Sequence, residues 1–168
     1  LTPDAKEKGR KLLQEGYQTY VFDDAEQARV LSTFPVEWEG RPEKPTVCLI
    51  GCPHNTYHEI LWWGQKVTEA LEKRGLKTAA IATKLFCSHV VRDHLVKDEP
   101  LLVGKMTLAG MRFTNMCTVS YAGMKGFSER TFAVTNSPKT RNYYPECRYL
   151  PDSVLIDVIC TGEIPKSA

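Results

Sequence analysis

The fold is decided by the stretch Thr46-Val47-Cys48-Leu49-Ile50-Gly51-Cys52-Pro53-His54-Asn55-Thr56. Its first half is an apolar run typical of a buried strand, and a long amphipathic segment over 57–74 follows it. This order predicts a parallel strand, a tight turn that Gly51 and Pro53 favour, and a helix capped by Asn55 or Thr56. Open α/β sheets bind ligands beyond the carboxyl ends of their strands. Cys52 and His54 are therefore candidate functional residues.

The composition limits the classes of function. The 168 residues suit one domain or part of a larger one, and a net charge of +2 favours neither nucleic acid nor a membrane surface as partner. No apolar run approaches the ~18 residues of a membrane-spanning helix. Six widely spaced cysteines form no C-x-x-C pair, which favours a reducing, cytoplasmic setting. Because the first residue is Leu1, we expect a fragment or a processed product.

Hydrophobic periodicity predicts alternating strands and helices. This alternation predicts an α/β fold, a three-layer α/β/α sandwich with a mainly parallel sheet. We expect an N-terminal helical segment and connector over 1–44 and an α/β domain over 45–168. Besides the central strand, the predicted strands cover 17–22, 77–82, 131–135 and 148–150, and the segment 112–119 contains a weaker strand that ends near Cys117. The predicted helices cover 2–14, 24–31, 57–74, 83–95, 99–110 and 152–160.

Polar and sulfur-containing side chains follow three of the predicted strands. They are Cys52-Pro53-His54, Asn115-Met116-Cys117 and Asn136-Ser137-Pro138-Lys139. If these strands are neighbours, two thiols, an imidazole and an amine converge at one sheet edge, and thiolates suit iron or an iron–sulfur cluster. The alternative is structural: buried inert thiols, a helix-capping histidine and a solvated lysine.

The same three segments resemble sequence elements of the aconitase X family. Gly51-Cys52-Pro53-His54 with Glu59 resembles the first element, and Asn115-Met116-Cys117 is similar to the second. Asn136-Ser137-Pro138-Lys139, followed by Tyr143 and Pro145, matches the third. The chain departs from the family at Asn115, where an acid is usual, at Asn142, where a histidine is common, and at Thr56, where serine is usual.

The resemblance implies a component of a hydro-lyase (dehydratase). Family members include mevalonate 5-phosphate and hydroxyproline dehydratases, so the implied substrate is a small hydroxy acid or its phosphate. The resemblance implies an iron or iron–sulfur centre on Cys52 and Cys117, catalytic roles for His54 and Lys139, and substrate contacts from Asn136, Ser137, Lys139 and Tyr143. The family also has a longer N-terminal portion with a further cysteine, and a small swivelling domain. We therefore expect a partner chain or a missing portion.

The residues suggest roles of their own. His54 is expected to orient the substrate or exchange a proton, because histidine is the side chain that most often serves as a general acid or base. Ser137 and Lys139, at a helix start, are expected to bind a carboxylate or phosphate. Cys87 is expected in the middle of a helix. Like the remaining cysteines, it is expected to have a structural role.

A second hypothesis is a non-catalytic α/β interaction or regulatory module that docks on a partner chain. Trp62 and Trp63 are adjacent on the predicted helix, so at most one of them can face the sheet. The other would mark the surface that binds the partner.

Overall fold

The computed structural model describes residues 2–34, 44–124, 127 and 131–165, and the chain divides into two compact units, 1–34 and 35–168. The first unit contains α1 (Pro3–Lys8), a 3-10 turn η1 (Gly9–Leu12) and α2 (Asp24–Ser32), with no buried residue in any of them. Asp23 caps α2 by accepting a hydrogen bond from the Glu26 N–H at 2.9 Å. The expected strand over 17–22 is wrong, because that segment has no strand partner among the residues that the structure describes. The expected boundary between the two parts of the chain falls after residue 44. The connector residues 35–43 just before it lie outside the described residues.

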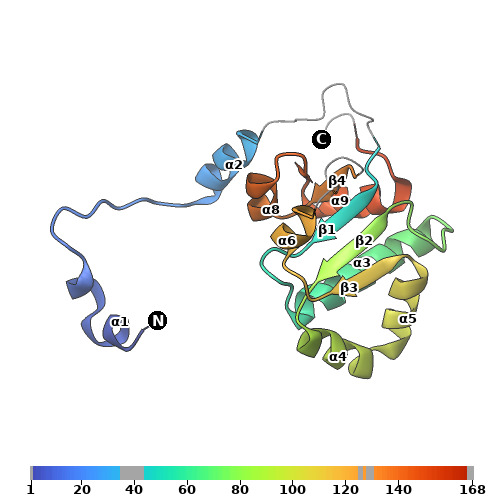
Figure 1. Cartoon of the computed structure of the whole chain (residues 1–168), viewed down its shortest axis with the longest axis horizontal. Helices are drawn as coiled ribbons and strands as arrows, with labels where there is room; N and C mark the ends of the chain where they lie inside the picture. The colour runs from blue at the N-terminus through green and yellow to red at the C-terminus, as the bar shows by residue number, and fades with distance from the viewer. Residues whose placement is uncertain (1, 35–43, 125–126, 128–130, 166–168) are drawn as a thin grey trace. The chain divides into compact units, whose positions relative to one another are not determined.

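The second unit is built on a five-stranded parallel sheet of order β3-β2-β1-β4-β5 (Figure 1). From β1 the chain moves outward to β2 and β3, and then returns to β4 on the other side of β1. The switch point of the topology therefore lies between β1 and β4, where such sheets usually bind ligands. The strands are β1 (Val47–Ile50), β2 (Ala82–Phe86), β3 (Met111–Thr114), β4 (Ala133–Thr135) and β5 (Arg148–Tyr149).

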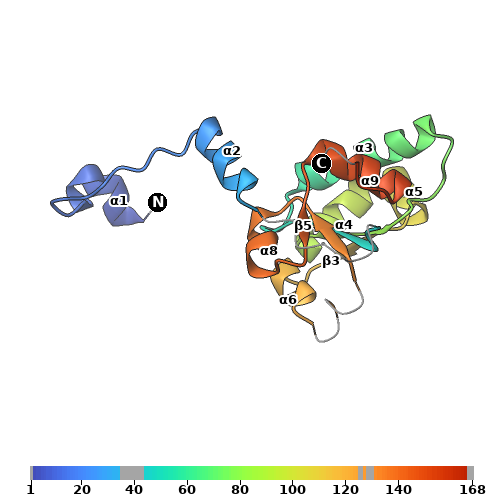
Figure 2. The same cartoon turned by 90° about the horizontal axis from the view of Figure 1, so that it is seen from above.

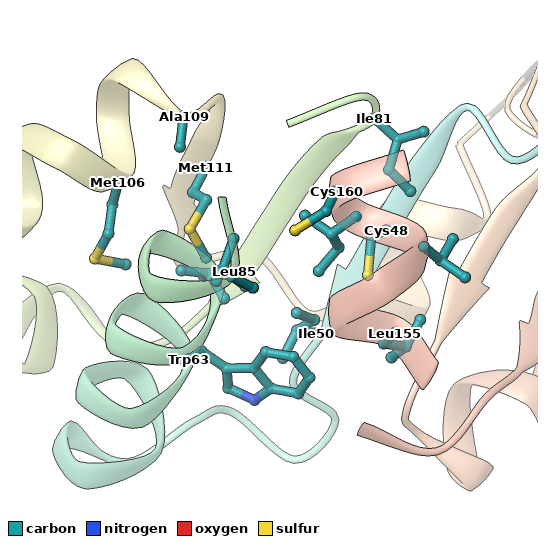
Figure 3. Packing of buried hydrophobic residues seen from close by; sticks show 14 of the residues in the cluster. Cys48, Ile50, Trp63, Ile81, Leu85, Met106, Ala109, Met111, Leu155 and Cys160 are labelled. Carbon is teal, nitrogen blue, oxygen red and sulfur yellow. The ribbon is translucent and has the colours of Figure 1, made fainter. Parts of the chain in front are cut away.

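Helices cover both faces of this sheet, which confirms the predicted α/β sandwich (Figures 1 and 2). Alternate β1 residues point to opposite faces. Cys48 and Ile50 lie in the larger apolar core, between α3 and α9 (Figure 3), while Val47 and Leu49 belong to the smaller one. The larger core is covered by α3 (Tyr57–Lys73), α4 (His89–Asp98), α5 (Pro100–Leu108) and α9 (Asp152–Thr161), and the smaller by α6 (Thr118–Ala122) and α8 (Pro138–Tyr143).

The helix after the central strand begins as the sequence predicts. Thr56, rather than Asn55, caps α3, and Glu59 completes a capping box by accepting the Thr56 N–H at 2.7 Å. Trp63 is 3% exposed and Trp62 is 38% exposed, which confirms that only one of the pair faces the core. Within the described residues, no helix has the length and apolar character that crossing a bilayer requires.

Two predicted boundaries around β2 are wrong. The strand predicted over 77–82 lies at 82–86, and the helix predicted over 83–95 begins at His89 with Ser88 as its cap. Cys87, expected in mid-helix, therefore follows the end of β2 and is buried. The strand predicted within 112–119, with its end near Cys117, ends at Thr114, and α6 follows where no helix was predicted.

Candidate functional site

Three loops meet at the carboxyl edge of the sheet, at its switch point. They follow β1, β3 and β4, and hydrogen bonds join them directly. His54 Nε2 lies 2.8 Å from the Met116 carbonyl oxygen, and Ser137 Oγ donates to the Cys52 carbonyl at 2.8 Å. The Thr118 hydroxyl donates to the Gly51 carbonyl. The structure thus brings together the three segments that carried the sequence hypothesis.

Gly51 and Asn55 fix the turn after β1. Gly51 has φ +113°, and a Cβ atom there would lie 2.2 Å from Asn55 Nδ2 and 2.8 Å from the Phe86 carbonyl oxygen. The buried Asn55 amide donates to the Ile50 and Phe86 carbonyls, both at 2.9 Å. The Asn55 backbone N–H also donates to Phe86, at 2.8 Å. Asn55 therefore joins the ends of β1 and β2, a role that sequence reasoning missed.

Cys52 and Cys117 lie on loops that face each other. Gly51 contacts Thr118, and His54 contacts Met116, so the two loops run past each other in opposite directions. These two contacts bracket Cys52 on one loop and Cys117 on the other. Cys52 is half-buried and Cys117 is exposed. The two cysteines therefore come from loops after different strands that meet at this edge of the sheet.

The environment of Cys117 favours the thiolate. This cysteine precedes the first turn of α6, and the backbone N–H groups of Ser120 and Val119 lower the pKa of its thiol. The Ser120 hydroxyl and the positive charge of Lys139 act in the same direction. The sulfur of Cys117 is thus prepared to act as a metal ligand or a nucleophile.

The thiols of four other cysteines have raised rather than lowered pKa values. Burial raises the pKa of the Cys48, Cys87 and Cys160 thiols, and it raises that of Cys147 to about 12. All four are buried. The expectation that these cysteines are structural agrees with their surroundings, which disfavour the thiolate that metal binding needs.

His54 has a defined tautomer in its neutral form. Its partner, the Met116 carbonyl oxygen, can only accept a hydrogen bond, so Nε2 must carry the proton. Nδ1 then keeps its lone pair. Because the side chain is also exposed, Nδ1 is accessible to a molecule bound at the loops.

Asn136 and Ser137 hold the β4 loop in place. The Asn136 amide donates to Asp152 Oδ1 at 3.0 Å. Ser137 caps α8, because its oxygen accepts the Thr140 N–H at 3.0 Å while its proton goes to Cys52. The single hydroxyl proton of Ser137 is therefore already donated within the protein in this structure.

Lys139 and Tyr143 are the accessible members of the predicted set on α8. Lys139 is exposed, and its charge acts on the Cys117 thiol. Tyr143 is 60% exposed, so it covers no closed pocket among the described residues. The basic side chain of Lys139 thus adds positive charge to the two-cysteine site.

The described residues contain no group of three or more histidine, cysteine, aspartate and glutamate side chains placed to hold a metal ion. The donor set at the loops consists of two thiols. Thiolates are soft ligands that iron accepts. Cys52 and Cys117 therefore fit part of an iron site, while a complete coordination shell needs further ligands.

The geometry defines a doubly wound parallel α/β unit in which the loops that carry Cys52 and Cys117 meet at the carboxyl edge of the sheet. A scan against protein-family models finds no match, and a search of curated proteins finds none. Among solved structures, the fold is similar to the holo form of aconitase X from Thermococcus kodakaraensis, with a TM-score of 0.61 and 20% sequence identity. The match covers 90% of this chain and 36% of that chain. The chain thus has an aconitase X-like fold and spans about a third of that relative.

Proposed function

We propose that this chain is one part of a hydro-lyase that removes water from a small hydroxy acid or its phosphate. The observation that carries the proposal is the contact between the loops that hold Cys52 and Cys117, at the carboxyl edge of the sheet in an aconitase X-like fold. The lowered pKa of the Cys117 thiol supports it, since metal ligation requires a thiolate.

In this proposal Cys52 and Cys117 hold an iron or iron–sulfur centre. The remaining ligands come from polypeptide beyond the described residues or from a partner chain, which also brings a small swivelling domain. When bound, the iron stabilises the negative charge that develops on a departing substrate hydroxyl. The chain alone is then inactive, because a catalytic site needs all the groups that touch its substrate and metal.

The other residues bind the substrate and move a proton. Lys139 supplies a positive charge for the carboxylate or phosphate, and Tyr143 is accessible beside it on α8. His54 Nδ1 exchanges a proton with the substrate, since Nε2 is engaged with Met116. Ser137 and Asn136 position the β4 loop through their own hydrogen bonds rather than by donating to the substrate.

Anaerobic turnover assays on the native assembly that contains this chain test the proposal. A panel of small hydroxy acids and their phosphates is screened for formation of an unsaturated product. We expect turnover that Cys52→Ala and Cys117→Ala abolish and Cys160→Ala retains, because Cys160 is buried in the core. An assembly that dehydrates none of these acids, or whose Cys52→Ala and Cys117→Ala variants keep full activity, contradicts the proposal. The alternative, a docking module using the exposed Trp62, then takes its place.

A further inference from the structure

The helix α5 has apolar residues on its outer as well as its inner side. Seven of its nine residues are non-polar, in the sequence Pro-Leu-Leu-Val-Gly-Lys-Met-Thr-Leu, yet Met106 alone is fully buried. Leu101 is 84% exposed and Leu108 is 76% exposed, the highest values for large hydrophobic side chains in the described residues. A helix that is apolar all round is normally covered on all sides. The outer side of α5 therefore has the composition of a contact surface.

The exposed leucines lie on one face. Positions 101, 104 and 108 are three and four residues apart, so they form a stripe on the side of α5 opposite to Met106. Gly104, between the leucines, has open space around it, with no atom within 4 Å of an added Cβ. We call Leu101, Gly104 and Leu108 the α5 stripe.

An apolar groove runs beside the stripe. Its volume is about 410 Å³. Leu71 of α3 and Leu108 of α5 line it, together with Leu76 and Ala109 from the loops that follow these two helices. The ion pair between Lys105 Nζ and Glu72 Oε1, at 2.8 Å, borders the same groove. The exposed Leu101 thus lies at the N-terminal end of α5, and the apolar groove lies at its C-terminal end.

We infer that the α5 stripe binds the same stripe of a second copy of this chain, with the two helices antiparallel. The midpoint between Leu101 and Leu108 falls next to Gly104, so a twofold axis there places Leu101 of each copy beside the groove of the other. The two contacts are identical by symmetry, as in the isologous interfaces of most homodimers. Gly104 lets the two helices approach closely at the axis.

The charges around α5 favour the antiparallel arrangement. Asp98 and Glu99 precede its first turn. Near its last turn, Lys77 lines the groove and Arg112 donates to the Thr107 carbonyl. Antiparallel packing brings the acidic end of one copy to the basic end of the other, whereas parallel packing brings like charges together. The helix dipoles also attract each other in this orientation. A second copy is therefore a better match for this surface than a purely apolar partner.

Sedimentation equilibrium of the 168-residue chain tests the inference. We expect a dimer, and we expect Leu101→Glu and Leu108→Glu each to raise its dissociation constant by about thirtyfold or more. Leu13→Glu is the matched control, an exposed leucine of the first unit, and should leave the constant unchanged. Circular dichroism checks that each variant folds. A monomer at every concentration overturns the inference, and so does a dimer whose dissociation constant Leu101→Glu and Leu108→Glu leave unchanged.

Cross-linking tests the register, in a background with Cys52→Ala and Cys117→Ala. With oxidised glutathione as the electron acceptor, Gly104→Cys should give a disulfide-linked dimer, since helices packed 8–10 Å apart bring the two backbones within disulfide reach near the axis. Leu101→Cys should not, because the two copies of position 101 lie roughly 10 Å apart along the helices. Cross-linking of Leu101→Cys, with or without that of Gly104→Cys, indicates a parallel or shifted contact and overturns the antiparallel arrangement.

Discussion

Replacing Asn55 by alanine removes the side chain that ties β1 to β2 under the candidate site. Two hydrogen bonds are lost, to the Ile50 and Phe86 carbonyls, each worth about 1 kcal/mol net. The Phe86 carbonyl keeps the backbone N–H of residue 55, but the Ile50 carbonyl loses this donor at a buried position, which costs about 1 kcal/mol more. We therefore expect the free energy of unfolding to fall by about 3 kcal/mol.

Urea titration followed by circular dichroism measures this change. For a chain of this length the corresponding fall in Tm is about 6–12 °C. Asn142→Ala is the matched control, since Asn142 is exposed on α8 and its loss should stay within about 0.5 kcal/mol. If Asn55→Ala also stays within that range, Asn55 does not hold the turn that joins the ends of β1 and β2.

Three further predictions concern the cysteines and the turn. The rate at which iodoacetamide alkylates Cys117 should reach half its maximum at a pH below that of an ordinary thiol. Lys139→Ala should raise this pH midpoint, and an unchanged midpoint contradicts the effect of the Lys139 charge. Burial holds the pKa of Cys147 near 12, so its contribution to stability is complete below about pH 8.5 and then falls by about 1.4 kcal/mol per pH unit. In urea titrations above about pH 8.5, Cys147→Ala should make the free energy of unfolding fall less steeply with pH. The same pH slope in the wild type and the variant refutes this prediction. Gly51→Ala should cost about 3 kcal/mol, against roughly 1–2 for Gly75→Ala, which has a positive φ but no close contact; equal costs contradict the steric argument.

The sequence predicted the centre of the fold because local signals agree there. An apolar run, a glycine, a helix cap and an amphipathic helix follow one another between Val47 and Lys73. Around β2 local signals mislead, because the Ala-rich segment 79–82 is as apolar as a strand. The Ala79 and Ala80 N–H groups instead donate to Ala109 and Ile159, outside the sheet, and the strand starts at Ala82.

The strand predicted over 17–22 shows a different limit. Its aromatic and β-branched residues have high strand propensity, but a strand also needs a partner to accept and donate its backbone hydrogen bonds. In the structure the large side chains of Tyr17, Tyr20, Val21 and Phe22 are all more than half exposed. Propensity alone therefore does not decide secondary structure.

The candidate site could be predicted only in part. Cys52, His54, Cys117 and Lys139 were found because each follows a strand, and the sheet order then brings their loops together. The role of Asn55 depends on Phe86, which is 31 positions away, so it requires the sheet topology. The lowered pKa of Cys117 depends on α6, a five-residue helix too short to show a periodic pattern.

Iron and acid-labile sulfide content of the native assembly, purified without oxygen, tests the central claim most directly. The site geometry predicts that iron is present in the wild type and is lost from both Cys52→Ala and Cys117→Ala, whereas Cys160→Ala retains it. Loss from both variants is expected because the two cysteines lie on loops that contact each other and would share one centre. Iron retained at wild-type levels in both single variants would contradict a shared centre on Cys52 and Cys117.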